Sequence, residues 1–120
     1  MKYLLMIYLN PEQFESFSEE EKQAVFDGHD ELIKLTKSTG EFVRGDALAD
    51  PSQSAVVRVR NGVPTVTDGP YVESKEFLAG YYMFDTETRE RAIELAAMIP
   101  DAGFHMIEVR PLMNESGSEM

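Results

Sequence analysis

The sequence contains no cysteine among its 120 residues. This absence excludes disulfide bonds, thiolate catalysis and zinc sites that are built on thiolates. A chain without cysteine also fits a reducing compartment, so we expect a cytoplasmic protein. The length is that of one domain, which can build a hydrophobic core without cross-links.

Positive charge is also scarce, because 11 Lys and Arg stand against 22 Asp and Glu, a net charge of −11. Nucleic-acid backbones and anionic membranes would repel such a surface, so we expect no direct binding to either. Long apolar runs are missing as well. The run within residues 1–12, MKYLLMIYLNPE, is far below the roughly 20 residues that span a bilayer. It also lacks the cleavage site of a signal peptide, and we interpret it as a buried strand.

Motifs for several chemistries are absent too. The sequence holds no glycine-rich phosphate loop and no serine in a nucleophile elbow. Its two histidines, His29 and His105, lie far apart without a paired spacing. We therefore expect no dedicated metal site, and no cofactor.

The first third of the chain predicts a strand at residues 3–9 and a helix that begins near Ser18 and ends before Gly40. Ser18 followed three residues later by Glu21 is typical of a capping box, and a glycine is a common helix stop. Side chains at helical spacing predict one buried stripe. Its members are Val25, His29, Leu32, Ile33 and Thr36.

Two glycines fall inside predicted elements. Gly28, in the helix, costs about 1 kcal/mol of helix propensity relative to alanine, which indicates close backbone packing or a local irregularity. Gly80 lies within a strand predicted at residues 77–84, where it indicates a bulge or a close approach to the backbone.

A β-hairpin is the strongest local signal. Asn61-Gly62 separates two alternating runs, AVVRVR and VPTVT, and both turn residues tolerate the positive φ of a two-residue hairpin turn. Because Pro64 cannot donate to a ladder, its strand should lie at a sheet edge. The predicted cross-strand pairs are Arg60 with Val63, Val59 with Pro64, and Val57 with Val66.

The remaining pattern predicts a strand at residues 41–48, a helix from Thr86 to Pro100 and a last strand at residues 104–110. We expect the first of these strands to be broken at Gly45-Asp46.

Together these elements predict an α+β domain at residues 1–112. Its fold would be a ferredoxin-like βαβ-type domain with a mostly antiparallel sheet, an inserted β-hairpin and two helices on one face. The polar tail, residues 113–120, is expected to be disordered.

His29 is the first candidate for chemistry, as a general acid or base oriented by a carboxylate. The alternative is a structural histidine at the core edge, bonded to Asp30 or to a backbone carbonyl. The second candidate is Asp68-Gly69-Pro70-Tyr71, whose first three residues are explained as a turn. Functionally, this turn could aim Asp68 or the Tyr71 hydroxyl into a cleft that the first helix also lines.

Basic residues are the third candidate set. Lys75 could bind an anionic or carbonyl substrate, or simply be solvated among its acidic neighbours. Arg44 and Arg58 could bind a substrate carboxylate. Alternatively, like Arg60 and Arg110, they could form ion pairs on the surface or across a subunit boundary.

These motifs together resemble a known family. The stretch VTDGPYVESKEFLAGYY is preceded by VRVRNG and followed by IPDAGFHMIEVRP. With His29 and the GDAL segment at residues 45–48, it is similar over residues 1–112 to the DGPF subgroup of the YCII-related proteins. The resemblance implies a dimeric α+β barrel, a homodimer in which two ferredoxin-like subunits pack their sheets face to face.

The resemblance also implies two alternative functions. In such proteins a histidine and an aspartate recur in a cleft, which makes His29 the acid or base. Related proteins carry an acidic residue just before the glycine that ends the first helix. This chain has Ser38-Thr39-Gly40 there, so Asp68 would have to serve instead, within hydrogen-bond reach of His29. Tyr71 stands where phenylalanine is commoner.

DGPF-type domains also resemble modules found beside alternative sigma factors. This implies the other function, a non-catalytic protein-interaction module with a sealed His29 and exposed apolar surface.

Overall fold

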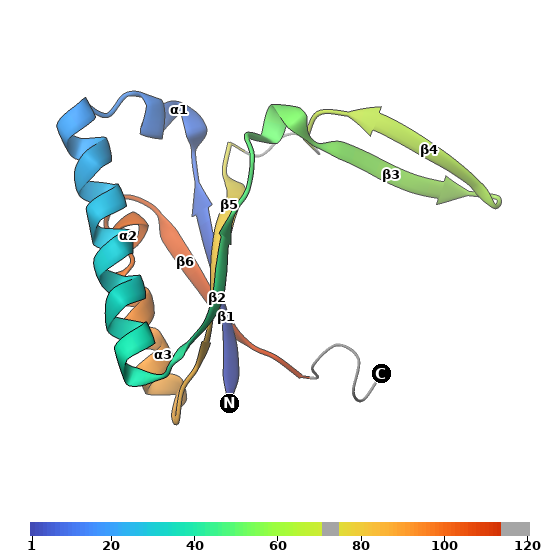
Figure 1. The fold of residues 1–120 in the computed structure, drawn as a ribbon. Helices are drawn as coiled ribbons and strands as arrows, with labels where there is room; N and C mark the ends of the chain where they lie inside the picture. The colour runs from blue at the N-terminus through green and yellow to red at the C-terminus, as the bar shows by residue number, and fades with distance from the viewer. Residues whose placement is uncertain (71–74, 114–120) are drawn as a thin grey trace.

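A four-stranded antiparallel sheet forms the centre of the computed structural model, which describes residues 1–70 and 75–113 (Figure 1). The strand order is β2-β5-β1-β6, and the two long helices both lie on one face. This is the ferredoxin-like α+β arrangement that the sequence predicted. The strands and helices are β1 (Lys2–Leu9), α2 (Glu19–Thr39), β2 (Phe42–Ala47), β5 (Phe77–Asp85), α3 (Arg89–Met98) and β6 (Met106–Pro111).

The ends of α2 follow the predicted local chemistry. The Ser18 side chain accepts from the Glu21 backbone N–H, and the Glu21 carboxylate accepts from the Ser18 N–H. Gly40 ends the helix in the left-handed region, with φ of 81°. Helix α3 begins later than predicted, because Thr88 caps it while the Thr86 hydroxyl is buried and donates to the Thr88 carbonyl.

Short helical segments complete the chain. The sequence pattern did not predict α1 (Pro11–Glu15), a single turn that Asn10 caps by accepting from two backbone N–H groups. Two 3₁₀ turns, η1 (Pro51–Gln53) and η2 (Pro100–Gly103), follow β2 and α3. The last strand, β6, consequently starts two residues later than expected.

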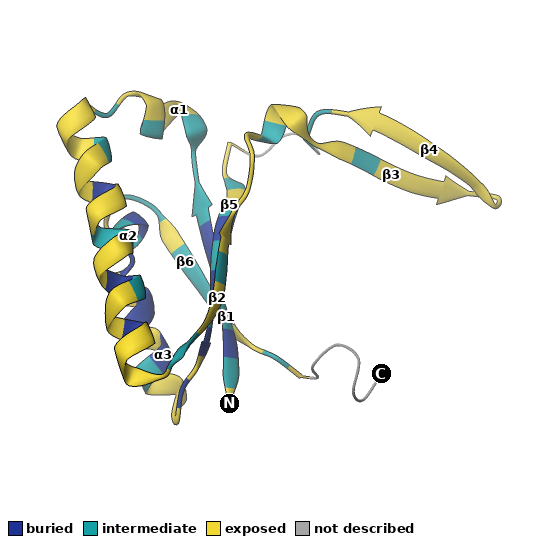
Figure 2. Cartoon of the chain, viewed as in Figure 1, coloured by how far each residue is buried: buried dark blue, intermediate teal, exposed yellow. Residues whose placement is uncertain are grey.

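The core lies between the sheet and the two long helices (Figure 2). Its fully buried apolar side chains come from β1, β5, α3 and the residue that follows α3: Leu5, Phe84, Leu95 and Ile99. The predicted stripe of α2 faces this core, with Val25, Leu32 and Thr36 buried. The helix therefore docks by the face that its periodicity indicated.

The pairing of the central sheet shifts register at two places, and one of the two lies at a glycine. The pairing of β1 with β5 shifts register between Ile7 and Tyr8, opposite Gly80, and a Cβ on Gly80 would meet the Asp46 carbonyl oxygen at 2.8 Å. Both readings of Gly80, the bulge and the close approach, are thus confirmed. Strand β2 is not broken at Gly45-Asp46 as predicted. Its register shift lies between Phe42 and Arg44 instead.

The opposite face of the sheet has no helix packed on it in the described chain (Figure 1). We call it the uncovered face. Side chains that alternate with the core residues point there, among them Leu4, Met6 and Met83. Tyr81 also lies on this face, where its hydroxyl donates to Asp46, and Arg44 donates to the same carboxylate at 2.7 Å.

The predicted hairpin forms a separate two-stranded sheet of β3 (Ala55–Arg60) and β4 (Val63–Asp68), which we call the arm (Figure 1). All three predicted cross-strand pairs are present, and the turn has φ of 50° at Asn61 and 77° at Gly62. Each of its strands is an edge strand, as Pro64 required. At its root the Gly69 N–H donates to the Ser54 carbonyl at 2.8 Å. The arm projects from the domain and is almost wholly exposed (Figure 2).

Candidate functional site

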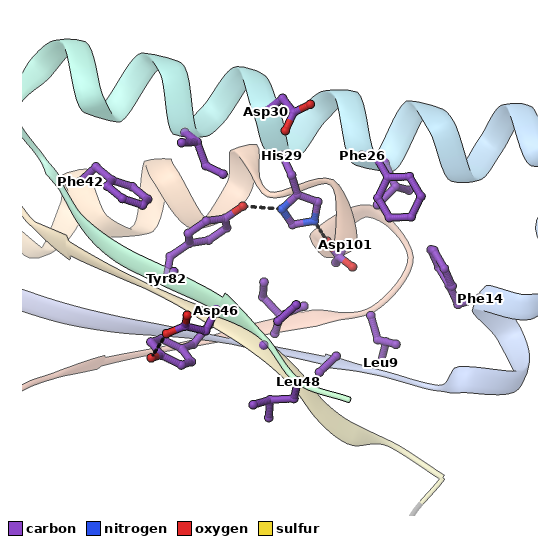
Figure 3. Close-up of a pocket in the computed structure, with 18 residues that line it drawn as sticks. Leu9, Phe14, Phe26, His29, Asp30, Phe42, Asp46, Leu48, Tyr82 and Asp101 are labelled. Atoms are coloured by element: carbon purple, nitrogen blue, oxygen red, sulfur yellow. Dashed lines mark hydrogen bonds and ion pairs between the residues drawn. The ribbon is translucent and has the colours of Figure 1, made fainter. Parts of the chain in front are cut away.

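His29 lies on the sheet side of α2, and both of its ring nitrogens are engaged (Figure 3). Its Nδ1 lies 2.6 Å from the Tyr82 hydroxyl of β5, and its Nε2 lies 2.6 Å from Oδ1 of Asp101 in η2. The Tyr82 residue and the Asp101 side chain are each only 5% exposed, whereas the His29 side chain is 21% exposed. A histidine, a tyrosine and a carboxylate from three elements thus form one hydrogen-bonded array.

Gly28 allows Asp101 to reach His29. A Cβ at Gly28 would lie 2.5 Å from Cγ of Pro100, closer than real Cβ atoms approach other atoms. The proline ring therefore packs directly on the α2 backbone, and the next residue, Asp101, lies beside the His29 ring. Of the two interpretations of Gly28, close packing is the correct one.

Gly45 has the same role for Tyr82. These two residues are paired across β2 and β5, and a Cβ at Gly45 would lie 2.6 Å from the tyrosine ring. The ring can therefore lie flat over the β2 backbone with its hydroxyl directed at α2. Tyr82 also stacks on Phe84, with ring centroids 5.3 Å apart. Two glycines and one aromatic neighbour fix the array.

The protonation of the array follows from Tyr82. Burial, together with the negative charges of Asp101 and Asp30, raises the pKa of Tyr82 to about 12. The hydroxyl therefore keeps its proton at neutral pH. The arrangement that satisfies all three groups has Tyr82 donating to His29 Nδ1, and His29 Nε2–H donating to the Asp101 carboxylate. Asp101, which is buried, needs such a donor.

The array forms part of the wall of a cavity of about 500 Å³ between α2 and the sheet. The unpredicted helix α1 contributes to this wall, since Phe14 packs edge-on against Phe26 with centroids 6.3 Å apart. Most of the lining is apolar, including Leu9, Phe14, Val25, Phe26, Ile33 and Phe42. Its charged residues are Asp30, Asp46 and Asp101, and no lysine or arginine is among the described lining residues.

Comparison with known proteins identifies the family of this chain. Residues 1–116 match the YCII-related domain family. The chain belongs to this family. An uncharacterised protein of Rhizobium meliloti (strain 1021) is 28% identical to it over 116 residues, which cover 93% of this chain and 92% of the relative. The narrower assignment of this YCII-related protein to the DGPF subgroup stays a prediction.

Asp68 is not the carboxylate that His29 contacts in this YCII-related protein. It lies exposed at the end of β4 and does not line the cavity, while Asp101 occupies Nε2. The expected His29–Asp68 contact is therefore not seen. The hydrogen bonds of His29 do not support the prediction that Asp68 orients its ring. Tyr71 lies outside the described residues. His29 itself is in the position that the helical spacing predicted.

The predicted substrate-binding cations lie elsewhere. Lys75 is exposed after the arm, and Arg58 is exposed on β3. Arg44 is bonded to Asp46 on the uncovered face, a contact that raises the pKa of Arg44. The pKa of Asp46 is lowered by the hydrogen bond from Tyr81 and, next, by that from Arg44. None of the three cations lines the cavity. Their role in substrate binding stays a prediction.

Two further classes of site can be addressed within the described residues. No group of three or more histidine, aspartate or glutamate side chains there is arranged to hold a metal ion. No helix in residues 1–70 and 75–113 is long and apolar enough to cross a bilayer. The second histidine, His105, is largely buried, with Nε2 at 3.4 Å from Glu76.

Sequence reasoning missed Asp101 and Tyr82. Asp101 carried one usable signal, because the segment after α3 lies beside the middle of α2, and Gly28 marked where the packing is closest. Tyr82 carried another, because strand alternation puts it on the same face as the buried Phe84.

Proposed function

We propose that this protein binds a small, apolar, uncharged molecule in the cavity and exchanges a proton with it through His29. The proposal rests on one observation. The histidine has a buried carboxylate on one nitrogen and a protonated hydroxyl on the other, at the wall of an apolar cavity. Such a group can take up and release protons while the carboxylate stabilises the cationic ring.

A ligand hydroxyl is the group that suits this array best, because it both donates and accepts. Inserted between Tyr82 and His29, it would donate to His29 Nδ1 and accept from the Tyr82 hydroxyl. Transfer of the ligand proton to Nδ1 leaves an imidazolium, whose Nε2–H stays bonded to Asp101. The oxyanion formed on the ligand keeps the hydrogen bond from Tyr82, whose pKa of about 12 makes it a donor at neutral pH.

The cavity also favours one charge class of ligand. Its described lining has no basic side chain, and of its three aspartates only Asp46 is paired with a cation, Arg44 on the uncovered face, so a buried carboxylate ligand would have no cation beside it. An unpaired buried charge costs several kcal/mol, which disfavours acids and phosphate esters. This proposal therefore leaves Lys75, Arg44 and Arg58 without a part in binding.

Matched probes test the proposal. Phenol, benzyl alcohol and benzoate have similar apolar bodies, but benzoate alone is anionic at pH 7. We expect the two alcohols to raise the melting temperature and to shift the NMR signals of the His29 ring, and benzoate to do neither.

Neighbouring tyrosines supply the control variants. Tyr82→Phe removes a donor from the array and should weaken phenol binding roughly tenfold. Tyr81→Phe removes a hydroxyl one residue away, on the uncovered face, and should leave binding within about twofold. Equal effects of the two substitutions, or tightest binding of benzoate, would contradict the proposal.

The alternative function is a protein-interaction module linked to a sigma factor. It requires His29 to be sealed by packing, whereas this ring is partly exposed at a cavity wall. The exposed valines of the arm are the observation in its favour, and they need an explanation of their own.

A further inference from the structure

The arm carries apolar side chains that nothing in the described chain covers. Its valines at positions 57, 59, 63 and 66 are between 61% and 64% exposed. A two-stranded hairpin alone in water is only marginally stable, and it gains stability when one face packs on another surface. We therefore expect the exposed valines of the arm to pack against a partner surface.

The arm has two faces of different character. Cross-strand partners share a face, so the pairs Val57–Val66 and Val59–Pro64 form one side that is apolar up to Asp68, opposite Ala55 at the root. The pairs Arg58–Thr65 and Arg60–Val63 form the other side, which carries both arginines of the arm. Only one face is suited to packing against an apolar surface.

Charge indicates what kind of partner the arm fits. The arm, residues 55–68, holds two arginines and one acidic residue, Asp68 at its root, a charge of +1. The rest of the chain then carries −12, since the whole carries −11. A basic arm on an acidic domain is electrostatically complementary to another copy of the same domain.

The position of the arm indicates the same partner. It extends on the side of the sheet away from α2 and α3, the side of the uncovered face (Figure 1). That face presents half-buried apolar side chains such as Leu4 and Met83 between the ion pairs at its borders, Arg44–Asp46 and Glu108–Arg110. A second molecule that stacks on the uncovered face would therefore lie next to the arm.

We propose that the arm clasps a second copy of this chain, with the face of Val57, Val59 and Val66 packed on that copy. The resemblance to dimeric α+β barrels implies contact between the two sheets only. The clasp adds a separate contact, and it is independent of the function proposed for the cavity. In a symmetric dimer each copy would hold the other in this way.

A pair of matched substitutions tests the clasp. Val57 and Val63 are both 61% exposed in the monomer but lie on opposite faces of the arm. Val57→Asp should raise the dimer dissociation constant at least tenfold, because it buries a carboxylate in the contact. Val63→Asp adds the same charge to the arginine face and should change the constant by less than about threefold. Sedimentation equilibrium over a range of protein concentrations measures both.

A variant without the arm tests whether Val57→Asp lowers dimer affinity only because it unfolds the protein. Ser54 and Gly69 are hydrogen-bonded at the root of the arm, so a short glycine linker can replace residues 55–68 without disturbing the central sheet. This variant should keep its circular dichroism and its phenol binding while it loses dimer affinity. A wild-type chain that stays monomeric would overturn the proposal. A dimer unaffected by Val57→Asp and by excision would likewise overturn the proposal.

Discussion

Gly28→Ala isolates the contact that brings Asp101 to His29. The substitution adds one methyl group in the middle of α2, at a point where a Cβ would lie 2.5 Å from Cγ of Pro100. The proline ring is rigid and is followed directly by Asp101, so the methyl group can be accommodated only if η2 moves away from α2. That movement lengthens the hydrogen bond from His29 Nε2 to Asp101.

Three contributions decide the expected size of the effect. Alanine in place of glycine stabilises a helix interior by about 1 kcal/mol. Overpacking destabilises by about 1–3 kcal/mol. Loss of the bond to the buried Asp101 carboxylate adds roughly 1–3 kcal/mol. We therefore expect a net loss of about 3 kcal/mol in the free energy of unfolding, despite the better helix former, or about 12 °C in melting temperature.

Gly103→Ala is the control for this experiment. Gly103 ends the same η2 turn, but a Cβ there would meet nothing within 4 Å. Urea unfolding of both variants and NMR of the His29 ring compare stability with the state of the array. If Gly28→Ala proves as stable as the wild type, with an unchanged His29 signal, then the packing of Pro100 does not position Asp101.

Three other predictions concern protonation and helix ends. Because the folded pKa of Tyr82 is about 12, against 10.0 for a free tyrosine, its contribution to stability should be lost as pH rises from 10 to 12. The tyrosinate absorbance that appears near pH 12 should be smaller in Tyr82→Phe by the contribution of one tyrosine, while Tyr8 and Tyr81, whose pKa values are also raised, keep theirs. Arg91→Met removes a two-point contact with Glu41 (2.9 and 3.0 Å) and should destabilise the fold by about 1 kcal/mol at pH 7. Since the Arg91 contact lowers the pKa of Glu41, the difference from wild type should disappear as acid unfolding is measured below pH 4. Ser18→Ala should cost about 1 kcal/mol in thermal unfolding by breaking the capping box, whereas Ser16→Ala should cost less.

The elements that sequence predicted well are those specified by local chemistry. Asn61-Gly62 determines its hairpin because both residues accept a positive φ, and the register of the whole arm follows from this turn. Ser18 and Gly40 likewise define α2 through backbone groups within one turn of each end. Alternation and helical spacing then assign each strand and helix a buried face. The fold class follows from these local rules.

The site depends instead on contacts between distant segments. His29, Tyr82 and Asp101 are separated by 53 and 72 positions along the chain from the histidine, and no local pattern links them. Asp68 was the more conspicuous carboxylate because it stands in a distinctive turn, yet that turn belongs to the root of the arm. Gly28 and Gly45 were visible as anomalies in their elements. What each glycine makes room for, Pro100 and the Tyr82 ring, became apparent only in three dimensions.

Tyr81 and Tyr82 are consecutive residues whose hydroxyl groups lie on opposite sides of the sheet. One is bonded to Asp46 on the face where a second subunit would stack, and the other to His29 at the cavity. A single peptide unit therefore joins the tyrosine bonded to Asp46 on the uncovered face to the tyrosine bonded to His29 at the cavity. If a second copy stacks on the uncovered face and changes the twist of β5, the Tyr82 ring that contacts His29 would move together with the Tyr81 ring.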